Sequence, residues 1–379
     1  MGLSIVLSGC DNIQKNEIPT QTIKIASKAP EIIATATVAN TSIRNVNCVQ
    51  VDDIVQTNST IVGQIVIKDD KGLALCNLIS GIQQSLPGTD HALYFTTSFS
   101  PDYKHFSYID SSSNLVIVSA TGEMQIIDLQ ESVGFWVSDW LNNQEIAFAF
   151  PTRDDGSMAI YNIDTGEFRQ VITNIEDINN IDPISWYGGN TPISIIDPSL
   201  SRLIYLSNDL PGIGGHGFVM RDKETNNVLW QKAGVIGTKP AWSSNGSFAA
   251  VATNLTNKDN IYIVNRNGEE HQVISFEHDY PDADVSVQNM KWSPHGKYLA
   301  FISKISLNEK ERQVLFVYNL QTKTSKQFEI SNSTRIIWSP NDGQILVNGY
   351  FIDLETNQKY ALTSNNESFE PLGWLETSK

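Results

Sequence analysis

The densest run of chemically active side chains in this sequence spans residues 277–284 and reads Glu-His-Asp-Tyr-Pro-Asp-Ala-Asp. The run consists of the candidates Glu277, His278, Asp279, Tyr280, Asp282 and Asp284, together with Pro281 and Ala283. Oxygen ligands of this kind can hold a hard cation or dock a basic partner. The spacing matches no known calcium loop, so a solvated acidic loop is the favoured interpretation and no metal site is predicted.

Two further runs could contribute to binding. Trp186 and Tyr187 are adjacent aromatics followed by two glycines, a setting suited to protein or sugar contacts. Buried packing between repeats is an equal alternative for them. Residues 212–217 match G-x-G-x-x-G formally and contain His216. A strand rather than a helix is expected to follow, so this run offers no helix N-terminus to a pyrophosphate and is interpreted as a loop.

The sequence contains none of the catalytic motifs that its residues could suggest. The chain has no G-x-S-x-G elbow, and its six histidines show neither H-x-x-x-H nor H-E-x-x-H spacing. Residues 152–156 partly resemble a sialidase Asp-box, but the aromatic expected after it is missing and the motif does not recur. We therefore predict a binding protein without a cofactor. An enzyme with a central-channel site, either a lyase or a glycan hydrolase, and a module that binds glycan or metal remain alternatives.

The elements that must position these loops recur from residue 61 onward. Trp292–Phe301 is the clearest copy of a unit that Phe99–Tyr108 matches without a gap. Each copy reads as a strand ending on a large residue, a tight Ser-Pro-Asp/Asn-Gly turn and an apolar strand. A second hairpin follows, as in Ile160–Phe168. The repeat therefore contains four antiparallel strands.

The two ends of the repeat region complete each other. Residues 63–81 read as a repeat that lacks its first strand, and the strand around Trp374 has nothing after it. Joining them would close a ring and remove two exposed sheet edges. The repeat anchors are Phe99, Trp140, Ile196, Trp242, Trp292, Trp338 and Trp374. We predict an all-β, seven-bladed β-propeller over residues 61–379, with six blades as the alternative if the weak copy at Ile196 is rejected.

The turn motif resembles the WD40-like (PD40) repeats of the TolB-like propeller family. The resemblance covers residues 61–379 and is carried by the Trp-Ser-Pro-Asp-Gly turn, kept most fully at Phe99, Trp292 and Trp338. It implies an exported bacterial protein that acts through protein contacts. The family is commonly six-bladed, which is the alternative blade count given above.

Meander geometry predicts where a ligand would bind. The first and third turns of a four-stranded blade share one face of the disc, and the second turn and the connection between blades share the other. The irregular insertions 174–190, 208–217, 275–287 and 303–313 belong to the second face. Variable loops on a uniform scaffold commonly carry function, so this face is the predicted binding face.

The N-terminus carries an export signal. Leu7-Ser8-Gly9-Cys10 follows a short apolar run and resembles the lipobox of bacterial lipoproteins. The resemblance implies that Cys10 is acylated and anchors the chain to a membrane of the cell envelope, facing outside the cytoplasm. An ordinary thiol is the alternative. Residues 1–10 are then a signal remnant and residues 11–60 a flexible tether, within which a short edge strand near residues 32–38 is possible.

In an oxidising compartment the two remaining cysteines, Cys48 and Cys76, could form a disulfide that ties the N-terminal segment to the first blade. Two unpaired buried thiols are an equal alternative.

The overall charge narrows the class of partner. Acidic side chains outnumber basic ones 42 to 26, for a net charge of −16, which disfavours nucleic acid and anionic lipid headgroups. No stretch approaches the ~18 apolar residues of a spanning helix. The predicted partner is an envelope protein or peptide, bound by a monomeric disc whose only membrane contact is its lipid anchor.

Overall fold

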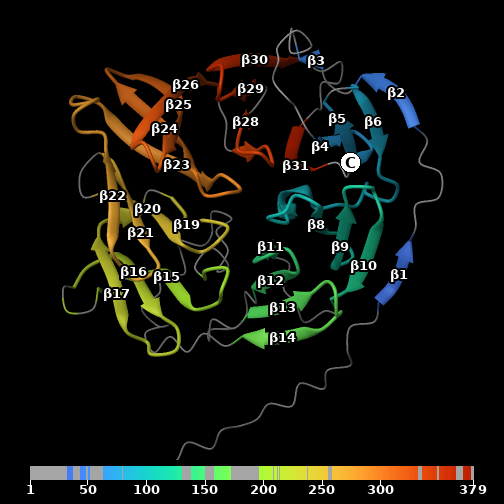
Figure 1. Cartoon of the computed structure of the whole chain (residues 1–379), viewed down its shortest axis with the longest axis horizontal. Helices are drawn as coiled ribbons and strands as arrows, with labels where there is room; N and C mark the ends of the chain where they lie inside the picture. Colours follow the sequence, from blue (N-terminus) through green and yellow to red (C-terminus); the bar gives the residue numbers. More distant parts are fainter. Residues whose placement is uncertain are drawn as a thin grey trace, which may run out of the picture.

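Seven small antiparallel sheets stand around a central axis and form a closed ring (Figure 1). The computed structural model describes residues 32–36, 43–47, 50–51, 63–78, 80–129, 138–149, 158–171, 196–207, 209–210, 212, 214–236, 238–254, 258–331, 335–347, 350–363 and 370–376. The predicted seven-bladed β-propeller is confirmed, and the six-bladed alternative is excluded.

The blades are numbered here around the ring, each with its innermost strand first. Blade 1 contains β31 (Glu370–Leu375), β4 (Gln64–Asp69), β5 (Gly72–Asn77) and β6 (Ile82–Ser85). Blade 2 contains β7 (Ser98–Phe99), β8 (His105–Ile109), β9 (Asn114–Ser119) and β10 (Met124–Asp128). Blade 3 contains β11 (Ser138–Trp140), β12 (Glu145–Ala149), β13 (Met158–Asn162) and β14 (Phe168–Val171). A single 3₁₀ turn, η2 (Tyr94–Thr96), lies before blade 2.

Blade 4 contains β15 (Arg202–Ser207), β16 (Gly217–Asp222) and β17 (Val228–Ala233). Blade 5 contains β18 (Val235–Ile236), β19 (Ala241–Trp242), β20 (Phe248–Asn254), β21 (Asp259–Asn265) and β22 (Glu270–Ser275). Blade 6 contains β23 (Asp284–Trp292), β24 (Tyr298–Leu307), β25 (Lys310–Asn319) and β26 (Thr324–Ile330). Blade 7 contains β27 (Ile337–Trp338), β28 (Gln344–Val347), β29 (Tyr350–Asp353) and β30 (Gln358–Thr363).

The weak repeat at Ile196 is a real blade. Ile196 pairs with Leu203 through an isolated bridge, at the place where the other blades begin their innermost strand. The remaining three strands of blade 4 pair in sequence order. The count of seven blades, which depends on this copy, is therefore confirmed.

The ring closes as predicted. The C-terminal strand β31 pairs with β4, which places Trp374 opposite Ile65. Blade 1 is thus assembled from both ends of the repeat region, and the backbone groups along both strands are satisfied by pairing.

The N-terminal segment contributes three outer strands. β1 (Ile32–Ala36) pairs with β10 of blade 2, β2 (Ile43–Asn47) with β6 of blade 1, and β3 (Gln50–Val51) with β30 of blade 7. The edge strand expected near residues 32–38 is present as β1. All three strands lie within the segment 11–60 that was assigned to a tether, and they border the closing blade and its two neighbours.

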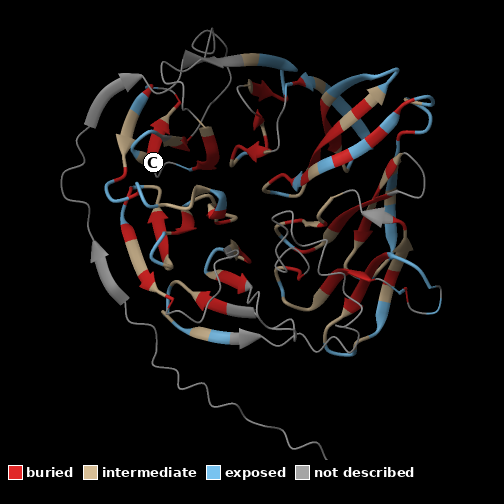
Figure 2. Cartoon of the chain, turned by 180° about the vertical axis from the view of Figure 1, so that it is seen from behind, coloured by how far each residue is buried: buried red, intermediate tan, exposed pale blue. Residues whose placement is uncertain are grey.

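The hydrophobic core is divided into seven clusters, one between each pair of consecutive blades. Figure 2 shows the buried residues on the inner strands, whereas outer strands such as β22 and β26 are largely exposed. Each blade therefore buries both faces of its sheet against its neighbours, which explains the continuous apolar runs in its middle strands.

The tryptophan anchors join each blade to the one before it. Trp292 Nε1 donates to the carbonyl of Ala241 at 2.9 Å, and Trp338 Nε1 donates to that of Lys291 at 3.2 Å. The ring of Trp338 stacks on Tyr298 of the preceding blade, with 6.0 Å between centroids. The large residue of each repeat therefore stabilises an interface between blades as well as its own strand.

One predicted insertion is regular structure. Residues 303–313, which we expected to form an irregular loop, continue β24 and β25 to a two-residue turn. Asn308 and Glu309 hold φ angles of 50° and 64° in that turn, as type I′ hairpins require. Its tip, residues 307–312, is exposed and mostly charged, so it lacks the apolar alternation by which a strand is recognised in a sequence.

Tyr103 helps to close the ring. It lies in the first turn of blade 2 in the left-handed conformation, with φ 60°, where two other copies have Gly246 and Gly296. Its side chain packs into the cluster between blades 7 and 1, and its carbonyl accepts the backbone N–H of Glu376 at 2.8 Å. This packing opposes the cost of about 1–2 kcal/mol for a left-handed non-glycine residue.

The burial of Tyr103 makes the fold sensitive to alkali. Burial raises the pKa of its phenol above the ordinary value, and the Asp342 carboxylate adds to this effect. The neutral phenol is therefore favoured in the folded state, so its contribution is complete below about pH 10 and is lost as the pH rises further. Tyr103→Phe should move the midpoint of alkaline unfolding, followed by circular dichroism, to higher pH. Adding Tyr108→Phe should extend the shift, because burial also raises the pKa of Tyr108; equal midpoints in all three proteins would contradict this.

No helix among the described residues is long and apolar enough to cross a membrane.

Candidate functional site

A cavity of about 340 Å³ occupies the centre of the ring, within the ~300–1,000 Å³ range of ligand pockets. Six of the seven anchors line it: Phe99, Trp140, Trp242, Trp292, Trp338 and Trp374. The anchors that were predicted as structural therefore also border the cavity, where Phe99 and Trp242 are half-buried and the other four are buried. Ile196 is not among the lining residues that the structure describes.

Three charged side chains line this wall: Asp139, Lys239 and Lys291. They come from three blades, because Asp139 precedes Trp140 on β11, Lys239 lies just before β19, and Lys291 precedes Trp292 on β23. Asp139 Oδ1 accepts hydrogen bonds from Ser98 Oγ at 3.2 Å and from the Trp140 N–H at 3.0 Å. The carboxylate is thus held in place beside the cavity.

The cavity reduces the hydration of both lysines. Burial lowers the pKa of the Lys239 ammonium, and Asp139 partly offsets this effect. Burial also lowers the pKa of Lys291, where Asp139 opposes the shift and the positive charges of Arg335 and Lys239 add to it. By accessible surface Lys291 is exposed and Lys239 is half-buried. A protein of net charge −16 therefore presents two ammonium groups against one carboxylate at its centre, an arrangement that can hold an anion.

The predicted acidic loop lies elsewhere, in the connection between β22 and β23, and its last residue, Asp284, begins β23. Glu277, His278, Asp279, Asp282 and Asp284 are exposed, and Tyr280 is half-buried. Neither these residues nor any other described ones form a group of three His, Cys, Asp or Glu that could hold a metal ion.

The acidic loop is ordered by its own contacts. Tyr280 packs on Phe276 and donates its hydroxyl to Gln327 Oε1 at 3.0 Å. Lys258 Nζ lies 3.2 Å from Glu277 Oε2 and donates to the carbonyl of Pro281. The Lys258 ammonium therefore neutralises part of the negative charge of the loop, and this contact needs no bound metal ion.

The other predicted binding residues are not brought to the cavity. His216 is exposed just before β16, and neither it nor any residue of the acidic loop lines the cavity. Trp186 and Tyr187 lie outside the described residues. The cavity instead reaches the first turns at Ser244 and Pro294, so binding on the insertion-bearing face stays a prediction.

Sequence analysis missed Asp139, Lys239 and Lys291. A signal for two of them was present, because the residue immediately before the anchor lines the cavity in five blades: Asp139, Ala241, Lys291, Ile337 and Gly373. Aligning the repeats on their anchors would have placed Asp139 and Lys291 at this shared position.

Cys76 is buried on β5 and is disulfide-bonded. Cys10 and Cys48 lie outside the described residues, so the pairing of Cys48 with Cys76 and the acylation of Cys10 remain predictions.

Three comparisons relate the chain to known proteins. No family model matches the chain, and no curated protein matches it significantly. Among solved structures, the chain is similar to the Cps50 (Swd1) β-propeller domain of Myceliophteria thermophila, with 12% identity, a TM-score of 0.46, and coverage of 84% of this chain and 97% of that one. TolB from Acinetobacter baumannii matches with 10% identity, a TM-score of 0.41, and coverage of 83% of this chain and 66% of TolB. The chain is a seven-bladed β-propeller.

Proposed function

We propose that this propeller is a non-enzymatic scaffold that binds a segment of a partner protein or a peptide in its central cavity. The observation that carries the proposal is the central cavity, which is lined by two lysines and the half-buried Trp242 and bordered by four tryptophans that are at most 7% exposed. Aromatic side chains in a pocket are the typical anchors of a binding interface. Seven nearly uniform blades supply the rigid frame that such a pocket needs.

The proposal places the disc in the cell envelope, lipid-anchored through Cys10 and facing outside the cytoplasm. The Leu7–Cys10 motif supports this location. A closed ring with a core cluster at every blade interface supports a monomeric disc, since no blade needs a second copy to complete it.

Two observations count against a glycan hydrolase and a metal-binding module as alternative functions. A glycan hydrolase of the common type requires two carboxylates about 5–9.5 Å apart, and the described wall of the cavity holds one, Asp139. A metal-binding module needs a cluster of ligands, and the described residues form none. Neither observation favours a second function over binding.

Blocking the cavity should abolish binding. Ser244 lines the cavity near its end and is partly exposed, so Ser244→Trp would fill that end with an indole. The full chain would be used to capture partners from a membrane extract, with bound proteins identified by mass spectrometry. We expect Ser244→Trp to lose a partner that wild type retains.

Two variants control this experiment. Ser325→Trp introduces the same indole at an exposed position of outer strand β26 and should retain the partner. The triple variant Glu277→Ala, His278→Ala, Asp279→Ala tests the acidic loop. Loss of the partner in the triple variant but not in Ser244→Trp would overturn the cavity as the binding site and favour the insertion-bearing face.

A further inference from the structure

We infer that the bound segment presents a carboxylate, which Lys239 and Lys291 recognise inside the central cavity. This inference rests on the proposed function and specifies the chemistry of the partner. The lysines belong to consecutive blades and both line the cavity. An ammonium–carboxylate hydrogen bond is about twice as strong as one between neutral groups.

The position of Lys291 is fixed by the fold. Its backbone carbonyl accepts a hydrogen bond from Trp338 Nε1 at 3.2 Å. In the sheet of blade 6, Lys291 on β23 pairs with Ala300 on β24. Lys291 makes no ion pair within 4 Å among the described residues, whereas ten other pairs do form there. Its ammonium therefore keeps its donors available to a ligand.

The charge around the cavity favours an anion. Asp139 is the one carboxylate in the described wall, and it faces two ammonium groups. Arg335 adds a third positive charge near Lys291, partly balanced by Glu370 at 3.9 Å. The half-buried Lys239 gains more from an opposite charge than an ammonium in bulk water does. A ligand carboxylate would therefore be attracted to the two lysines at close range.

The size of the cavity restricts the ligand. A volume of about 340 Å³ lies at the small end of ligand pockets and admits a short chain segment, not a folded domain. An Asp or Glu side chain and a C-terminal carboxylate share the chemistry required, and peptides can distinguish them.

The five tryptophans of the wall provide the readout, because a ligand beside them changes their fluorescence. The full chain would be titrated with three peptides: acetyl-Gly-Gly-Glu-amide, acetyl-Gly-Gly-Gly with a free carboxylate, and the neutral acetyl-Gly-Gly-Gln-amide. We expect at least one carboxylate peptide to bind about tenfold more tightly than the neutral one, and binding to weaken with added salt. The peptide that binds identifies the source of the carboxylate.

Matched variants test the assignment to the lysines. Lys239→Gln and Lys291→Gln should each weaken carboxylate binding about tenfold, whereas Lys310→Gln, at an exposed position of β25, should leave it unchanged. Asp139→Asn keeps the shape of the side chain and removes the carboxylate that competes with the ligand for the two lysines, so it should tighten binding of the carboxylate peptide. This variant tests the inference even if a lysine variant folds poorly.

Equal binding of the three peptides, or unchanged binding in both lysine variants, would overturn the inference. The proposed function would survive that result if Ser244→Trp still lost its partner. Retention of the partner by Ser244→Trp would instead reject the proposed function itself.

Discussion

Trp374→Ala should lower the free energy of unfolding by about 3–5 kcal/mol, the usual cost of truncating a buried tryptophan. Trp374 is 1% exposed and packs between blades 1 and 7, where its ring lies 6.0 Å from that of Phe351. Its strand is also the one that closes the ring. The cavity left by the indole would therefore weaken the blade whose innermost pair, β31 and β4, is not joined by a hairpin turn.

Urea unfolding followed by circular dichroism measures this loss. Trp242→Ala is the matched control, because Trp242 is the corresponding anchor of blade 5 but is only half-buried and lies in a continuous repeat. We expect a smaller loss for it. Deletion of residues 370–379 should have a larger effect still, since it exposes the edge of β4 and promotes aggregation. A soluble deletion variant that unfolds at the wild-type urea concentration would contradict the closing role of β31.

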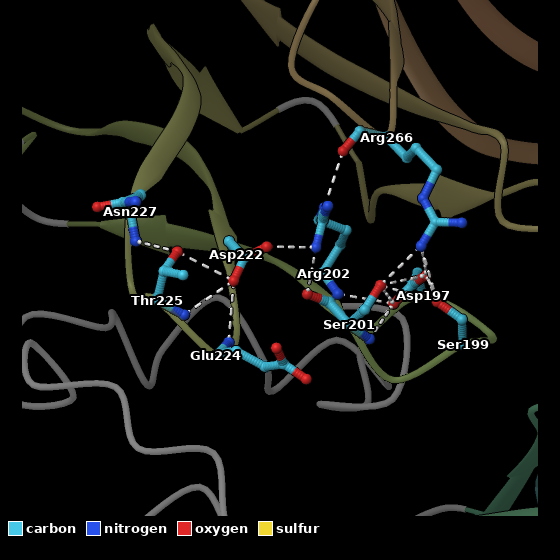
Figure 3. A network of polar contacts seen from close by, with 9 residues as sticks. All are labelled: Asp197, Ser199, Ser201, Arg202, Asp222, Glu224, Thr225, Asn227 and Arg266. Atoms are coloured by element: carbon cyan, nitrogen blue, oxygen red, sulfur yellow. Dashed lines mark hydrogen bonds and ion pairs between the residues drawn. The ribbon is translucent and has the colours of Figure 1, made fainter.

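The second large effect is expected at Asp197, the turn residue of the weakest repeat (Figure 3). Its fully buried carboxylate accepts the backbone N–H groups of Ser201 at 2.6 Å and Arg202 at 2.7 Å. Arg266 of blade 5 lies 3.9 Å away and donates to Ser199 and Ser201. Asp197→Ala would leave the two backbone N–H donors without their acceptor, at a cost of about 1–3 kcal/mol for each.

The other repeats supply the matched variant. Ser293 and Ser339 occupy the same position, and their hydroxyls accept the backbone N–H groups of Tyr298 at 3.1 Å and Gln344 at 2.9 Å. Asp197→Ser should therefore recover much of the stability lost in Asp197→Ala. Arg266→Ala should lower the free energy of unfolding less in Asp197→Ser than in wild type, because the serine carries no charge that could pair with Arg266. A double-mutant cycle measures this difference. If Asp197→Ser were as unstable as Asp197→Ala, the acceptor role of this residue would be wrong.

The sequence alone determined the class of fold, the number of blades and the place of closure. These features depend on local chemistry that repeats: a serine or aspartate that caps a tight turn, a residue such as Gly246 that adopts positive φ, and a large apolar anchor. Each repeat is nearly a complete sheet, so short-range patterns specify it. The strand around Trp374 could be assigned because a blade without its first strand needs one.

Only the tertiary structure decided which side chains surround the centre of the ring. Asp139, Lys239 and Lys291 lie far apart in the sequence and meet because three blades direct their innermost strands toward one axis. The packing of consecutive blades puts the indole of Trp338 on a carbonyl of the preceding blade, and the outer edge of blade 1 pairs with β2. Sequence patterns report the periodicity of single strands. These contacts depend instead on the angle between neighbouring blades, and that angle is set by packing across the whole ring.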